Sequence, residues 1–153
     1  MARRIKAVAY SEEYRISRLN SEEFKENNDC AVVAVSVATG TPYNVVHKIM
    51  KQNGRKEGRG TFHTITKKTL AVLGYELKTV WARDFIDRYP GRHKNLRSVT
   101  SHHPRRFHDV WADGKTYLFQ SNSHIWCVRD GENRDWSINR ALRVIHIYEL
   151  VKL

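Results

Sequence analysis

An uncharged stretch of ten residues constrains the fold of this chain more than any other feature. Cys30–Thr39 reads CAVVAVSVAT, and Gly40 follows it. Before it stand Asn27, Asn28 and Asp29, residue types that favour a helix N-cap, whereas Gly favours the position just past a helix C-terminus. Periodicity cannot separate a buried helix from a buried strand here, but the flanking residues favour a helix. A helix without a polar face belongs at the centre of a domain.

Two further helices are expected in the first half of the chain. Thr41 as N-cap and Pro42 at the first helical position begin one helix, which ends at Asn53-Gly54. The other is expected over about Thr64–Leu73, because Gly74 supplies its end.

After Gly74 the pattern changes, and Tyr75–Trp81 alternates between polar and apolar residues as a strand does. Further strands are expected over Thr116–Gln120, His124–Arg129, Arg134–Ile138 and Arg143–Val151. Between two of them, Asp130-Gly131 is the strongest hairpin signal in the sequence. Helices followed by antiparallel strands predict an α+β fold, with N-terminal helices packed on a C-terminal antiparallel sheet. A chain of 153 residues fits one domain, residues 1–153.

The charge of the chain is strongly positive. Lys and Arg number 27 against 16 Asp and Glu, which gives +11 at pH 7. No acidic residue occurs between Arg88 and His108. The basic residues there are Arg88, Arg92, Lys94, Arg97, Arg105 and Arg106. They predict a surface for nucleic acid or an acidic protein, although such charge also serves solubility alone, and no known nucleic-acid-binding motif accompanies it.

The sequence predicts a cytoplasmic protein that needs no cofactor or metal. No apolar run is long enough for a membrane span, and the polar residues that follow Arg3-Arg4 do not form the apolar part of an export signal, so a cytoplasmic protein is expected. Its two cysteines, Cys30 and Cys127, are then expected to be reduced. Cys127 is expected in the core. No cofactor or metal is expected, since no Cys or His pair has the spacing of zinc ligands.

Cys30 is a candidate nucleophile because of its place in the first turn of the expected central helix. Free backbone N–H groups and the helix dipole favour a thiolate there, and the same groups can stabilise an oxyanion. The alternative is a small buried apolar residue, which is a common role for cysteine.

His124 and Asp135 are the expected partners of that nucleophile. His124 begins a strand, which holds a base more rigidly than a loop does. A two-residue turn at Asp130-Gly131 would pair Arg129 with Glu132 and make Asp135 a diagonal neighbour of His124, with their backbones about 7–8 Å apart. An Asp there fixes the imidazole tautomer and favours the imidazolium. The alternatives are a strand-end histidine and an aspartate that both face solvent.

These motifs resemble those of papain-like cysteine peptidases, in the chain order Cys, His, Asp. The resemblance covers about residues 27–136 and rests on Asn28-Asp29-Cys30 before an Ala/Val helix, Gly60-Thr61 before a third helix, and His124 followed by Asp135. It is closest to the leader peptidases that cleave after double glycine and to small peptidase-like proteins of bacteriophages. The resemblance implies that Cys30 is the nucleophile, His124 the general base and Asp135 the residue that orients it.

Two positions depart from the family pattern, and both bear on activity. Phe24 stands where that pattern has a Gln oxyanion donor, and Ala31 stands where the leader peptidases have Gly. Asn27 or Asn28 is then expected to replace the missing donor, together with the Cys30 backbone N–H.

The resemblance implies a cysteine-dependent acyl-transfer enzyme (a peptidase, isopeptidase or amidase) that acts on a peptide or protein. If the protein is encoded by a phage, it would act in the host cytoplasm. One alternative is an inactive peptidase-like scaffold that binds nucleic acid or an acidic host protein through its basic residues. Another is a viral accessory protein that binds a host factor without chemistry.

Overall fold

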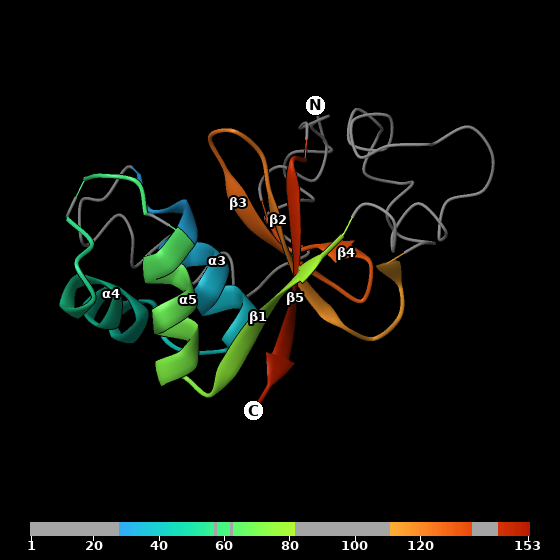
Figure 1. The fold of residues 1–153 in the computed structure, drawn as a ribbon, viewed down its shortest axis with the longest axis horizontal. Coiled ribbons are helices and arrows are strands. Elements are labelled where there is room, and N and C mark those ends of the chain that lie inside the picture. Colours follow the sequence, from blue (N-terminus) through green and yellow to red (C-terminus); the bar gives the residue numbers. More distant parts are fainter. Residues whose placement is uncertain (1–27, 57, 62, 82–110, 136–143) are drawn as a thin grey trace.

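The computed structural model describes residues 28–56, 58–61, 63–81, 111–135 and 144–153. In this part of the chain three helices precede five strands (Figure 1). The helices are α3 (Cys30–Thr39), α4 (Tyr43–Gln52) and α5 (His63–Val72). The strands are β1 (Tyr75–Val80), β2 (Thr116–Gln120), β3 (Ile125–Arg129), β4 (Glu132–Asn133) and β5 (His146–Lys152). The predicted α+β class is confirmed.

The strands form one antiparallel sheet in the order β1-β5-β2-β3-β4. Strand β5, near the end of the chain, lies between β1 and β2, and the helices group on one side of the sheet (Figure 1). None of the helices in the described ranges has the length and apolar character needed to cross a bilayer.

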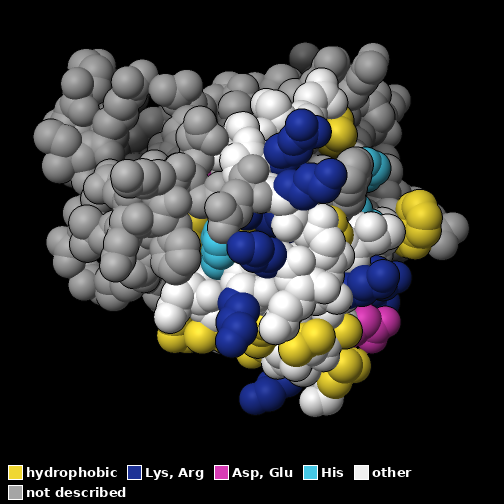
Figure 2. Space-filling view, turned by 90° about the vertical axis from the view of Figure 1, so that its left-hand side faces the viewer, with side chains coloured by type: hydrophobic (Ala, Val, Ile, Leu, Met, Phe, Trp, Pro, Cys, Tyr) yellow, Lys and Arg dark blue, Asp and Glu magenta, His cyan; other side chains and the backbone are white. Residues whose placement is uncertain are grey.

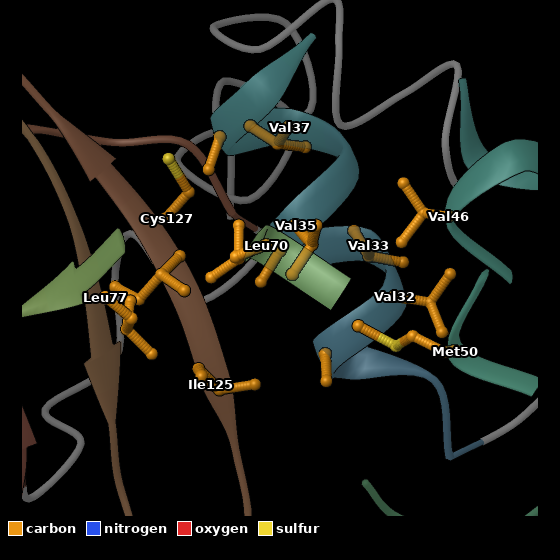
Figure 3. Close-up of a cluster of buried hydrophobic side chains, with 14 of the residues drawn as sticks. Val32, Val33, Val35, Val37, Val46, Met50, Leu70, Leu77, Ile125 and Cys127 are labelled. Carbon is orange, nitrogen blue, oxygen red and sulfur yellow. The ribbon is translucent and has the colours of Figure 1, made fainter. Parts of the chain in front are cut away.

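Helix α3 occupies the centre of the core, as its composition predicts. All eight residues from Ala31 to Ala38 are buried. Figure 3 shows α3 between a sheet strand that carries Ile125 and Cys127 and the neighbouring helix that carries Val46 and Met50. Burial of an apolar side chain of this size contributes about 1.5–3 kcal/mol. Packing on both sides therefore stabilises this Val-rich segment as a helix, although Val itself favours strands.

The C-terminus of α3 is held against the end of β3. The Arg129 guanidinium donates hydrogen bonds to the carbonyl oxygens of Val37 and Ala38, and a cation is favourable at that end of a helix dipole. Gly40 ends the helix with a left-handed φ of 70°, and its N–H donates to the Ser36 carbonyl. One end of α3 is thus fixed relative to the sheet.

The structure corrects the expected capping of two helices. Asp29 is the N-cap of α3, but its side chain makes no capping hydrogen bond and accepts one from the Tyr43 hydroxyl instead, at 2.7 Å. The N-cap of α4 is Pro42 and not Thr41, because the Pro42 carbonyl accepts the hydrogen bonds of Val45 and Val46. The Thr41 hydroxyl lies 2.8 Å from that of Thr39.

The predicted hairpin is confirmed in its turn and its register. Asp130 and Gly131 have φ values of 48° and 75°, as a tight primed turn requires, and Arg129 pairs with Glu132. Strand β4 starts earlier than predicted, at Glu132, and residues 136–138 of the predicted strand lie outside the described residues. Pairing still continues beyond it, since the Arg134 N–H donates to the Cys127 carbonyl at 2.9 Å.

Candidate functional site

Three side chains that the sequence singled out meet at one end of α3. Cys30 is the first residue of α3, His124 immediately precedes β3, and Asp135 follows β4. The His124 Nε2 lies 2.7 Å from the Asp135 Oδ2. The Cys30 side chain lies close enough to the same imidazole to raise its pKa, through hydrogen bonding and through charge. Because Nε2 faces the carboxylate, Nδ1 is the ring nitrogen left for the sulfur.

The lengths of α3 and β3 explain how these residues meet. A helix of ten residues is about 15 Å long, and the five steps from His124 to Arg129 span about 17 Å in a strand. Arg129 holds the C-terminus of α3 at the far end of β3. A helix of matching length that lies along the strand therefore has its first residue, Cys30, beside His124.

The environment of His124 stabilises its protonated form. Burial lowers its pKa, but hydrogen bonds to Asp135 and Cys30 and the charges of both outweigh this effect, and they raise the pKa from 6.5 to about 9. The His124 side chain is 11% exposed and that of Asp135 is 5% exposed, so water screens the pair only weakly. An imidazolium at neutral pH stabilises an adjacent thiolate and can protonate a leaving amine.

The imidazole of His124 is held in its orientation by further contacts. It stacks on the buried Trp126 ring, with centroids 5.4 Å apart and planes 14° apart. The Ser121 N–H donates to the His124 carbonyl at 2.8 Å, which ties the start of β3 to the end of β2. Contacts to ring and backbone together leave the base little freedom, as a catalytic geometry requires.

The end of α3 that carries Cys30 has backbone N–H groups without a partner in the helical ladder. The first helical hydrogen bond of α3 runs from the Val33 N–H to the Asp29 carbonyl, at 3.0 Å. The N–H groups of Cys30, Ala31 and Val32 precede the first hydrogen bond of the helix. N–H groups in this position at a helix N-terminus attract anions. Cys30 is partly exposed, so a substrate can reach its sulfur, and N–H groups at this helix end are suitable donors to a developing oxyanion.

Asn28 is exposed and hydrogen-bonded to the loop between α4 and α5. Its side-chain amide donates to the Gly58 carbonyl at 2.9 Å. This contact uses one of the two hydrogens on the amide nitrogen, and a role for Asn28 as an oxyanion donor stays a prediction. The other candidate, Asn27, lies outside the described residues, as does Phe24.

Two buried polar residues near the site make side-chain contacts that the sequence reasoning missed. Asp29, 3% exposed, connects the residue before Cys30 to Tyr43 on α4. Arg55, 4% exposed, donates to the Asn28 carbonyl at 3.3 Å and to the Thr61 hydroxyl at 3.1 Å. The sequence carries no signal for the contacts of Arg55 with Asn28 and Thr61. Arg55 stands in a polar loop, and the side chains of such a loop are expected to face solvent.

Two predictions remain: the core position of Cys127, which is confirmed, and the basic binding surface, which lies outside the described residues. Cys127 is buried, at 1% exposed, and packs in the core beside α3 (Figure 3). The six basic residues of the predicted binding surface lie outside the described residues: Arg88, Arg92, Lys94, Arg97, Arg105 and Arg106.

Comparison with known proteins adds no relative. No protein-family model matches the chain, and no match was found among curated proteins or solved structures.

Proposed function

We propose that this protein is a cysteine-dependent acyl-transfer enzyme that cleaves or transfers a peptide, isopeptide or other amide bond. Cys30 is the nucleophile, His124 the general base and acid, and Asp135 the residue that orients His124. The observation that carries this proposal is the mostly buried imidazole of His124, which lies 2.7 Å from Asp135 and whose pKa is raised by both Asp135 and the Cys30 side chain.

In the first half of the reaction, the Cys30 sulfur attacks the amide carbonyl carbon and a C–S bond forms. The carbonyl oxygen becomes an oxyanion, which the backbone N–H groups at the start of α3 stabilise. The C–N bond then breaks, and the His124 imidazolium gives its proton to the leaving amine. The product of this half is a thioester on Cys30.

In the second half, water or an amine attacks the thioester, and His124 takes its proton. The C–S bond breaks, the acid or new amide leaves, and the sulfur regains its negative charge beside the imidazolium. Asp135 accepts a hydrogen bond from Nε2 throughout, which keeps the proton-transferring nitrogen, Nδ1, directed at the sulfur.

Two features support this proposal over the inactive scaffold. The chain order Cys, His, Asp and the cysteine at the start of a buried helix resemble papain-like cysteine peptidases. In addition, burial of the His124–Asp135 ion pair costs desolvation energy. A protein that only binds a partner through surface charge does not need such a buried pair. The net charge of +11 favours the scaffold, as a binder of nucleic acid or an acidic protein.

Alkylation by iodoacetamide under reducing conditions tests the proposal, with mass spectrometry to assign the modified cysteine. Cys30 is expected to react at pH 7 at least ten-fold faster than a free thiol, and the rate is expected to fall at least ten-fold in His124→Ala. Cys127 serves as the internal control, because it is buried. Slow labelling of Cys30 that does not depend on His124 would remove the nucleophile and the proposal with it.

A further inference from the structure

The loop between α4 and α5 and the start of α5 line an open pocket of about 630 Å³ that the chemistry above does not use. Its lining includes Gly54, Arg55, Lys56, Arg59, Thr61 and Ile65. We propose that this pocket binds an acidic side chain of the peptide substrate, near the bond that is cleaved. The inference rests on the proposed function and names the class of substrate.

The pocket is tied to the segment that carries the nucleophile. Arg55 donates to the Asn28 carbonyl, and the Asn28 side chain donates back to the Gly58 carbonyl. Asn28 is two residues from Cys30 along the chain. Two hydrogen bonds in opposite directions therefore fix the pocket loop to the segment that leads into Cys30.

The charge of the pocket selects an anion. Arg55, Lys56 and Arg59 line it, and Arg55 is held in place by its bond to Thr61. The sequence of this loop contains one carboxylate, Glu57, which lies outside the described residues, so the cations outnumber it. Figure 2 views this side of the molecule, where Lys and Arg side chains recur and acidic ones are scarce.

The remaining lining fits a side chain with an aliphatic stem. Ile65 is buried and apolar, and it can pack against the methylene groups of a Glu or Asp while a guanidinium takes the carboxylate. A volume of about 630 Å³ is also within the usual range of ligand pockets, about 300–1,000 Å³.

The first test is peptide binding to full-length Cys30→Ala, measured by fluorescence anisotropy at 0.15 M salt. The probes are a fluorescein-labelled hexapeptide with two central Glu residues between alanines and its counterpart with two Gln residues. The Glu peptide is expected to bind at least ten-fold tighter. The preference is expected to disappear in Lys56→Gln/Arg59→Gln, which changes two exposed side chains and leaves the buried Arg55 in place.

A matched control separates the pocket from general attraction to a basic protein. Lys78→Gln/Lys152→Gln removes the same charge from exposed positions on β1 and β5 and is expected to keep the preference. Equal affinity for the two peptides, or an equal loss in the control, would overturn the inference. Tighter binding of a labelled single-stranded DNA dodecamer that is lost only in the pocket variant would overturn it in favour of nucleic acid.

The second test joins the pocket to the site in the protein with Cys30 intact. The unlabelled Glu peptide at saturation is expected to slow iodoacetamide labelling of Cys30 at least five-fold, with no such protection in Lys56→Gln/Arg59→Gln. For each protein the protection is measured as the ratio of its labelling rates without and with peptide, so that a difference in basal rate between the two proteins cancels. Fast, His124-dependent labelling that the Glu peptide does not slow contradicts the pocket alone, whereas labelling that ignores His124 contradicts the proposed function.

Discussion

His124 Nε2 lies 2.7 Å from Asp135 Oδ2 across a hairpin whose turn is Asp130-Gly131. The turn sets the register, and the register makes residue 135 a diagonal neighbour of residue 124. Both side chains are nearly buried, so their interaction is weakly screened by water and salt. The pair therefore determines the protonation and orientation of the base before any substrate arrives.

Substitution of Asp135 by the isosteric Asn is expected to lower the pKa of His124. Burial lowers that pKa, and the hydrogen bond to Asp135 is the largest influence that raises it, to about 9. Without the carboxylate, only the Cys30 side chain and the neutral Asn amide oppose the effect of burial, so the pKa of His124 falls by about one unit or more. NMR titration of the His124 ring measures the shift, and iodoacetamide labelling of Cys30 at pH 7 is expected to slow at least ten-fold.

Glu132→Gln is the control for this change, because it removes a carboxylate from the same hairpin. Glu132 is exposed and pairs with Arg134 at 2.7 Å. It is expected to leave the His124 titration and the labelling rate unchanged. If Asp135→Asn behaved like Glu132→Gln, Asp135 would not be the residue that sets the state of His124.

The raised pKa of His124 also predicts how stability depends on pH. The pKa is about 9 in the folded protein and about 6.5 in the unfolded chain. The stabilisation is therefore fully present below about pH 6.5 and is lost as the pH rises through 9, up to about 3 kcal/mol from a shift of this size. Urea unfolding of wild type and His124→Gln should give free energies whose difference shrinks between pH 6 and pH 10. A difference that grew over this range would contradict the protonated state of His124.

Arg129→Met is expected to destabilise the protein by about 1–3 kcal/mol. It removes the charged hydrogen bonds from Arg129 to the Val37 and Ala38 carbonyls at the end of α3. The control is Lys115→Met, which breaks the ion pair of Lys115 with Glu149 (3.1 Å) at a half-exposed side chain and is expected to cost less than about 1 kcal/mol. Urea unfolding compares the two, and equal costs would argue against a role for Arg129 in holding α3.

Tyr43→Phe is expected to disturb the residue next to the nucleophile. The Tyr43 hydroxyl donates to the buried Asp29 carboxylate, and removal of a donor from a buried acceptor costs about 1–3 kcal/mol. Cys30 follows Asp29 directly, so its labelling by iodoacetamide is expected to slow several-fold. The control is Tyr75→Phe, the same change on β1, which is expected to leave the labelling rate intact. Equal rates in both variants would exclude Asp29 as a positioning residue for Cys30.

Much of this site could be predicted because its parts depend on short stretches of chain. Gly40 and the polar residues before Cys30 bound the central helix, and Asp130-Gly131 sets the hairpin. Such signals act through backbone geometry within a few residues, so they are readable without the fold. Strand β2 was predicted residue for residue for the same reason, since its apolar centre and the polar turns that bound it are local signals.

Capping and side-chain partners were less predictable. Asp29 stands at the expected N-cap position, yet its carboxylate bonds to Tyr43, because α4 brings a buried hydroxyl within reach. Arg55 is in a polar loop but is buried against Asn28 and Thr61. In both cases a contact from another element outweighs the local preference, and the sequence contains no record of which elements pack together.

The sequence by itself determined the class of the fold, the central helix that begins at Cys30, and the hairpin that brings Asp135 to His124. Only the tertiary structure decided that Cys30 meets His124, because that contact depends on α3 lying along β3 with Arg129 at its far end. Local hydrogen bonds and turn geometry carry the first set of features. The second comes from burial of apolar side chains between helix and sheet, which acts between residues that are distant in the chain.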